Sequence, residues 1–82
     1  MRLIYDMTTK TINQINPNKL HLSKWTAIAP INKEKHFIVT KVIKDDLEQV
    51  SSCSIEAVIT HRESEINWLD LQDSNTWLYG WQ

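Results

Sequence analysis

The segment His36–Lys44 (HFIVTKVIK) constrains the fold of this chain more than any other stretch. It is dense in β-branched residues, which favour extended backbone. In an extended chain successive side chains point to opposite faces. The apolar side chains divide between the two faces as Phe37, Val39 and Ile43 on one and Ile38 and Val42 on the other. A strand that is apolar on both faces is typical of the middle of a sheet or of a small closed barrel.

Shorter β patterns flank this segment. Trp25, Ala27 and Ala29 alternate with other residues until Pro30 ends the run, and Pro30–Lys35 is predicted as a turn. Ser52–Thr60 alternates cleanly, and Glu65–Leu71 begins as a further strand. Strands joined by connections this short pair as antiparallel neighbours.

The last residues carry a helix-start signal. Asp73 or Ser74 can accept hydrogen bonds from otherwise unpaired N–H groups, and Trp77, Leu78 and Trp81 would then share one side of a short helix. The predicted fold class is therefore mainly β. We expect a small antiparallel meander of about four strands, shaped as an SH3- or Tudor-like barrel or half-barrel, with a short C-terminal helix.

The chain is divided by its polarity. Residues 1–18 are polar and lack a sustained period, so we predict a loosely ordered N-terminal extension, with a short strand at Arg2–Asp6. Residues 19–82 are predicted to form a single tryptophan-rich β domain. The start of the chain lacks the apolar core of a signal peptide, and no run approaches the roughly 20 apolar residues of a membrane span. A cytoplasmic location and no membrane partner are predicted.

The four tryptophans are the predicted source of stability. Cys53 is the single cysteine, so an internal disulfide and a multi-thiolate zinc site are both excluded. A small domain without such links depends on apolar burial, and each large aromatic side chain can bury roughly 150–250 Å². We expect Trp25 in the core. Trp68, Trp77 and Trp81 are interpreted as an apolar plug that closes the sheet, with an aromatic cage for a cationic ligand as the alternative.

Few residues are arranged for catalysis. His21, His36 and His61 do not occur at a short metal-ligand spacing with each other or with Cys53, so no metal site is predicted. Cys53 lies on the apolar parity of its strand, which favours a buried and inert thiol over a nucleophile. The chain has one glycine, and a phosphate-binding loop needs several. We therefore predict no catalytic residues and no cofactor.

Charge is unevenly distributed along the chain. Residues 1–44 hold eight basic and two acidic residues, whereas residues 45–82 hold one basic and eight acidic residues. One interpretation is a basic face for an anionic partner. The alternative is that the two halves pair in one sheet, so that opposite charges become neighbours.

A basic and aromatic surface is the predicted binding site. It consists of Lys24, Trp25, Lys33, Lys35, His36 and Arg62. Small β-barrels bind single-stranded nucleic acid with such surfaces, because aromatic rings stack on bases while cations contact phosphates. Arg62 is included because a guanidinium suits phosphate or carboxylate. The alternative is that Trp25 and Phe37 belong to the core and that the lysines form a solvated rim.

A set of residues resembles a known family. The matching positions are Asn16-Pro17, Ser23-Lys24-Trp25-Thr26, Pro30, Lys33-Glu34-Lys35-His36-Phe37, Glu56-Ala57-Val58, Arg62, Trp68, Asp73, Trp77 and Gly80-Trp81. Together they resemble a bacterial family of small tryptophan-rich conserved hypothetical proteins that carries a domain-of-unknown-function label. The resemblance spans roughly residues 16–82. It implies a free-standing bacterial protein, and it brings no activity and no catalytic residues.

The expected function is that of a non-enzymatic binding module. The predicted partner is a protein or an anionic, nucleic-acid-like polymer that contacts the basic and aromatic surface. The alternative is a structural adaptor that homodimerises through an exposed tryptophan and an edge strand. The two differ in their response to salt, because phosphate binding weakens steeply with ionic strength and apolar self-association does not.

Overall fold

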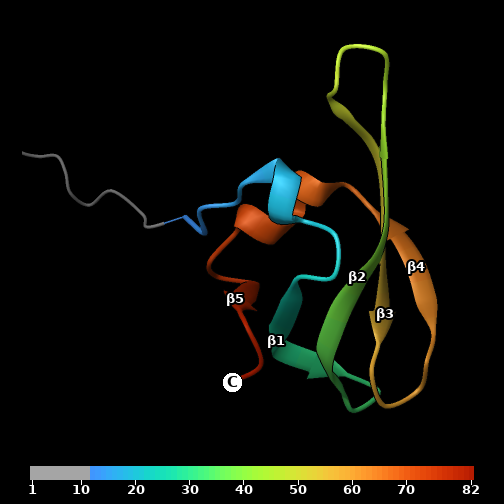
Figure 1. The fold of residues 1–82 in the computed structure, drawn as a ribbon. Coiled ribbons are helices and arrows are strands. Elements are labelled where there is room, and N and C mark those ends of the chain that lie inside the picture. Colours follow the sequence, from blue (N-terminus) through green and yellow to red (C-terminus); the bar gives the residue numbers. More distant parts are fainter. Residues whose placement is uncertain (1–11) are drawn as a thin grey trace, which may run out of the picture.

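The computed structural model describes residues 12–82, and its strands lie in one sheet of order β4-β3-β2-β1-β5 (Figure 1). All neighbouring strands are antiparallel. The elements along the chain are the 3-10 helix η1 (Pro17–Lys19), β1 (Lys24–Ile31), β2 (Glu34–Lys44), β3 (Val50–Ala57), β4 (Glu63–Ile66), the 3-10 helix η2 (Trp68–Gln72) and β5 (Trp77–Tyr79). The prediction of a mainly β, antiparallel fold is confirmed.

The closed barrel is not confirmed, because the sheet is open. Its edges in the described chain are β4 and β5, and these two strands do not pair with each other. The sheet also has five strands instead of about four. The additional strand, β5, lies on the free edge of β1, so the chain passes from η2 back to the other side of the sheet.

The predicted C-terminal helix is also not confirmed. The N–H groups of Thr76 and Trp77 both donate to the Asp73 carbonyl, at 3.0 and 2.9 Å, but this turn is not continued. Trp77–Tyr79 instead form β5, in which Tyr79 pairs with Trp25. Aromatic residues favour extended backbone, and the otherwise unpaired edge of β1 supplies the hydrogen bonds of a ladder.

A β-bulge interrupts the alternation of side chains along β2. Val39 lies opposite Ile55, whereas Lys41 lies opposite Ser54, so Thr40 is the extra residue. Alternation is reset at this point, and Val42 faces the same side as Phe37 and Val39. Our assignment of Val42 to the face opposite Phe37 and Val39 is therefore wrong. Our assignment of Ile43 to the face of Phe37 and Val39 is also wrong, because Ile43 points to the opposite face of the sheet and is 48% exposed.

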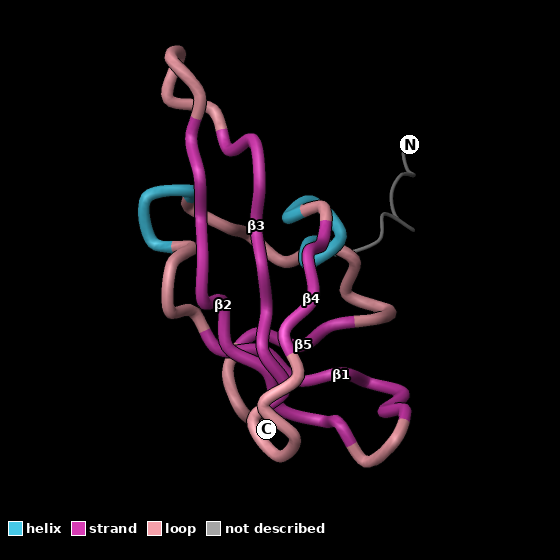
Figure 2. The backbone as a smooth tube through the Cα atoms, turned by 90° about the vertical axis from the view of Figure 1, so that its right-hand side faces the viewer, coloured by secondary structure: helices cyan, strands magenta, loops and turns pink. Residues whose placement is uncertain are grey.

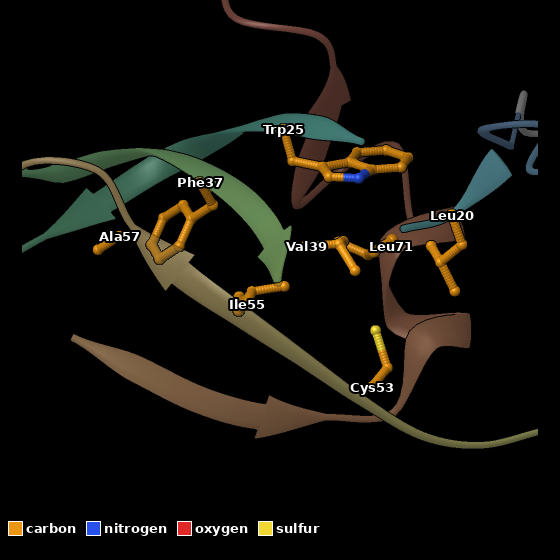
Figure 3. Close-up of a cluster of buried hydrophobic side chains, with 8 residues drawn as sticks. All are labelled: Leu20, Trp25, Phe37, Val39, Cys53, Ile55, Ala57 and Leu71. Carbon is orange, nitrogen blue, oxygen red and sulfur yellow. The ribbon is translucent and has the colours of Figure 1, made fainter. Parts of the chain in front are cut away.

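The core covers one face of the sheet (Figure 3). Strands β1 to β3 supply most of its side chains, and Leu20 and Leu71 cover them from beside η1 and from within η2. The buried residues are Leu20, Trp25, Phe37, Val39, Cys53, Ile55, Ala57 and Leu71. Trp68 and Trp77 pack against this core while partly exposed. Burial on one face leaves the other face of the sheet, here called the outer face, for polar and charged side chains.

Asn13, which precedes η1, forms hydrogen bonds with the backbone of η2 and β5. The Asn13 side-chain Nδ2 donates to the carbonyls of Leu71 and Trp77, at 2.8 and 2.9 Å. The Asn13 backbone N–H donates to the Gln72 carbonyl at 3.0 Å. The strand predicted at Arg2–Asp6 lies outside the described residues, and the division of the chain at residue 19 stays a prediction. Within residues 12–82, no helix has the length and apolar character needed to cross a membrane.

The hairpin that joins β2 to β3 extends beyond the rest of the sheet (Figure 2). Ile66, the last residue of β4, lies opposite Cys53, so β3 has only β2 beside it toward the tip. We call residues 43–51 the hairpin arm. Its turn is fixed by Asp45, whose Oδ1 accepts hydrogen bonds from the N–H groups of Leu47 and Gln49, both at 2.9 Å. The arm is thus a hydrogen-bonded projection with a defined end.

The central place of Trp25 leads to a stability prediction. Trp25→Ala should lower the free energy of unfolding by about 3–5 kcal/mol, because it leaves a large cavity in the core. Trp25→Phe, which keeps most of the apolar volume, should lower it less. Ile31→Ala is the control, since Ile31 is 74% exposed, and it should change stability by less than about 0.5 kcal/mol. Urea unfolding measures all three, and equal effects of the alanine variants would contradict this core.

Candidate functional site

Arg62 is exposed, but its guanidinium is engaged in an ion pair. Its Nε and Nη2 donate to the two carboxylate oxygens of Glu34, at 3.0 and 2.5 Å. The hydroxyl of Thr60 donates to the same carboxylate at 2.6 Å. These contacts join the start of β2 to the loop between β3 and β4. The charge of Arg62 is balanced within the molecule, so the predicted role of Arg62 in anion binding loses its main basis.

The Glu34 carboxylate is buried, with a side chain that is only 5% exposed. Hydrogen bonds from Arg62, then from Thr60, and the attraction of the guanidinium lower the pKa of Glu34 from 4.5 to about 2, against the opposing effect of burial. The same pair raises the pKa of Arg62. A bidentate contact of this kind holds both side chains in fixed geometry. Its role in the molecule is to hold the start of β2 against the loop between β3 and β4.

Trp25 is also unavailable to a ligand. It is fully buried, its Nε1–H donates to the Ser23 hydroxyl at 2.8 Å, and its ring meets that of Tyr79 edge to face at 5.0 Å. Trp25 faces the core because it lies opposite Phe37 on β2. The alternative interpretation, in which Trp25 and Phe37 belong to the core, therefore describes the structure.

Trp81 takes the place that we assigned to Trp25. Its ring is 46% exposed, and Lys24 Nζ lies 5.2 Å from the ring centroid. The imidazole of His36 lies 6.1 Å away, centroid to centroid, and the indole Nε1–H donates to the Phe37 carbonyl at 3.0 Å. We call Lys24, His36 and Trp81 the Trp81 surface. Two of the predicted binding residues are thus brought together, around a different tryptophan.

Hydrogen bonds fix the segment that carries Trp81. The Thr26 hydroxyl donates to the Gly80 carbonyl at 2.7 Å and accepts from the Gln82 N–H at 2.9 Å. The Gly80 N–H donates to the Lys24 carbonyl at 2.7 Å. Gly80 has a φ of 80°, a conformation that glycine adopts without strain and that turns the chain after β5. The exposed indole is therefore held in place along β1.

The remaining predicted residues lie elsewhere. Lys33 is in the turn between β1 and β2, with a φ of 64°. Lys35 alternates with Glu34 and His36 along β2, so its side chain points away from the outer face. Both lysines are exposed. The six predicted residues therefore do not form one surface.

Acidic residues share the outer face with the Trp81 surface. Lys24 lies opposite Ile38, Ile38 opposite Glu56, and Glu56 opposite Glu63, so one row runs from a cation to two carboxylates across four strands. His61 Nδ1 lies 2.9 Å from a carboxylate oxygen of Glu56, and the Thr40 hydroxyl donates to Glu63. The interpretation in which basic and acidic halves become neighbours fits this row and the pair between Arg62 and Glu34.

The aromatic cage, which was the alternative interpretation of Trp68, Trp77 and Trp81, does not form. Trp77 packs edge to face on Phe37, with ring centroids 5.2 Å apart, on the core side of the sheet. Trp81 lies on the outer face with Lys24. The plug interpretation therefore describes Trp68 and Trp77, and it is wrong for Trp81. Across residues 12–82, no three His, Cys, Asp or Glu side chains come close enough to bind a metal ion.

Comparison with known proteins gives one family. The family model described as tryptophan-rich protein (DUF2389) matches residues 23–82 of the chain. This match covers all five strands and η2. None of the curated proteins and none of the solved structures gives a significant match to the chain.

The ion pair between Glu34 and Arg62 predicts a pH dependence. The folded state lowers the pKa of Glu34 from 4.5 to about 2, so the pair stabilises the fold above pH 4.5 and this contribution is lost as the pH falls toward 2. Glu34→Gln should be less stable than the wild type at neutral pH and should lose less stability across that interval. Urea unfolding at a series of pH values measures it. Glu48→Gln, at the tip of the arm, is the control, and equal pH profiles for wild type and Glu34→Gln would contradict the assignment.

Cys53 leads to a reactivity prediction. Its side chain is buried, and this burial raises the pKa of the thiol. Because the thiolate is the reactive form, iodoacetamide should alkylate Cys53 slowly in the native protein and rapidly in denaturant. Mass spectrometry over a time course measures both rates. Rapid alkylation under native conditions would place the thiol at the surface.

Proposed function

This chain belongs to the tryptophan-rich protein family (DUF2389), and from its structure we propose that it is a non-enzymatic binding module. The observation that carries the proposal is the half-exposed indole of Trp81, held between Lys24 and His36. Tryptophan is enriched at the centres of protein interfaces, where its large ring contributes area at little cost in conformational entropy. A fixed, exposed ring with a lysine ammonium group and an imidazole beside it is suited to recognition.

The proposed partner is an acidic segment of another protein that also carries an apolar side chain. The apolar side chain would pack on Trp81, and acidic side chains would lie near Lys24 and His36. Nucleic acid fits less well, because a phosphate polymer needs several cations in a row. Arg62 is neutralised by Glu34, and Glu56 and Glu63 lie on the same face as Lys24.

A homodimerising adaptor is the second candidate. The observation that favours it is the edge strand β5, which has three residues and places Tyr79, 58% exposed, two residues before Trp81. A second copy could pair with this edge and cover both rings. Such apolar association would persist at high salt, whereas contact of an acidic segment with Lys24 would weaken.

The test uses isotope-labelled protein and a synthetic glutamate-rich peptide with one central phenylalanine. We expect chemical shift changes at the Trp81 indole N–H and at the amides of Lys24 and His36. Trp81→Ala should weaken binding by about thirtyfold, as for a central interface residue. Lys24→Ala should weaken it by roughly two- to fivefold, as for an exposed ion pair.

Lys35→Ala is the matched control, because Lys35 points away from the outer face, and it should bind the peptide like the wild type. Equal losses in the Lys24→Ala and Lys35→Ala variants would contradict a defined site. The same titration with single-stranded oligothymidylate at low salt tests the nucleic-acid alternative. A stronger response to the oligonucleotide than to the peptide would replace the proposed partner class.

A further inference from the structure

The tip of the hairpin arm presents an apolar side chain between two acids. Leu47 is 78% exposed, and Asp46 and Glu48 on either side of it are also exposed. Hydrogen bonds fix the conformation of this tip. The Asp45 carboxylate accepts hydrogen bonds from the backbone N–H groups of Leu47 and Gln49, and the Glu48 N–H donates to the Asp45 carbonyl at 3.0 Å. One acid is thus used to build the turn, and the other two are left to face solvent.

A groove of opposite charge lies at the base of the same arm. Its volume is about 460 Å³, and the residues that line it include His21, Lys41, Val42 and Lys44, which we call the basic groove. Lys44 Nζ donates to the Asn18 side-chain oxygen at 2.8 Å, which holds η1 against β2. This contact places η1 beside β2 at the base of the arm (Figure 2). Val42 gives the groove an apolar part that matches Leu47.

The tip cannot enter the groove of its own molecule. Leu47 is six positions after Lys41 in the sequence, roughly 20 Å at most at the rise of a β-strand. The turn is also fixed by the hydrogen bonds of Asp45, so the arm cannot fold back on itself. An occupant of the basic groove with the charge pattern of the tip must therefore come from another molecule.

We propose that the occupant is the arm tip of a second copy of this chain. In a two-fold dimer with antiparallel arms, each tip reaches the base of the partner's arm, and a single symmetry operation makes both contacts. Asp46 and Glu48 then lie near Lys41 and Lys44, and Leu47 lies near Val42. The arms present a small area compared with the 1,200–2,000 Å² or so of a standard interface, so the dimer is expected to be weak and salt-sensitive.

This dimer differs from the adaptor candidate described above. It uses the arm and the basic groove, and it leaves β5 and Trp81 exposed. In this dimer the acidic tip binds the basic groove of the second copy. The proposal does not depend on what the Trp81 surface binds.

The test is a charge swap measured by analytical ultracentrifugation of the full chain. Asp46→Lys/Glu48→Lys should weaken self-association at least about tenfold, because two basic regions would meet, and Lys41→Glu/Lys44→Glu should do the same with two acidic regions. An equimolar mixture of the two variants should associate as strongly as the wild type, since both contacts are then complementary. High salt should weaken association of the wild type.

Two controls separate this dimer from other causes. Lys33→Glu/Lys35→Glu changes the same number of charges in the turn region of β1 and β2 and should leave self-association unchanged. Lys41→Glu alone keeps the contact between Lys44 and Asn18, so it serves where the double variant unfolds. A wild type that remains monomeric at millimolar concentration overturns the proposal. Charge-reversed variants that dimerise like the wild type overturn it as well, and they would favour the edge-strand adaptor.

Discussion

Packing on one face of an open sheet is the constraint on which the rest of this molecule depends. A closed barrel of this size would enclose its apolar side chains within the barrel and would need no other element to cover them. Here the core side chains of β1, β2 and β3 are instead covered by Leu20 and Leu71, next to and within two short 3-10 helices. Trp25 is the largest fully buried side chain of this layer. The outer face stays in solvent, and it therefore carries the charged row from Lys24 to Glu63 and the Trp81 ring.

The strands were predictable because alternation and β-branching act locally, but the points where alternation is interrupted were not. His36–Lys44 is a central strand, as its composition predicts. Val42 joins the face of Phe37 and Val39 instead of the face of Ile38, because Thr40 is accommodated in a bulge opposite β3. A bulge depends on the register with a partner strand, and nothing in β2 itself specifies that register. The same limit applies to β5, where helix-start signals at Asp73 compete with a free strand edge that exists only after β1 and β2 have paired.

The candidate site was half predictable for a related reason. Lys24 and His36 were found because basic residues next to an aromatic residue form a recognisable pattern, yet the ring they flank is Trp81, more than forty residues away in the sequence. Arg62 was assigned to an external anion, although a signal for its partner was present. It is the single basic residue of the acidic half, and Glu34 is one of two acidic residues in the basic half. A charged residue that stands alone in a segment of opposite charge is a good candidate for an ion pair with a distant segment, and Arg62 and Glu34 form such a pair.

Charge separation along the chain thus has two structural outcomes. Where the halves pair, as at Glu34 and Arg62, opposite charges neutralise each other and stabilise the fold. β2 and β3 extend beyond the sheet as the arm (Figure 2), and no ion pair within residues 12–82 involves the acidic residues at its tip, whereas Lys41 and Lys44 line the groove at its base. His36 and Ile43 are seven residues apart on β2, roughly 23 Å, so the Trp81 surface and the arm are physically separate. A dimer formed through the arms would therefore present two Trp81 surfaces at once. A partner with two matching segments would then bind with an avidity greater than the affinity of either surface, provided that its linker spans the distance between them.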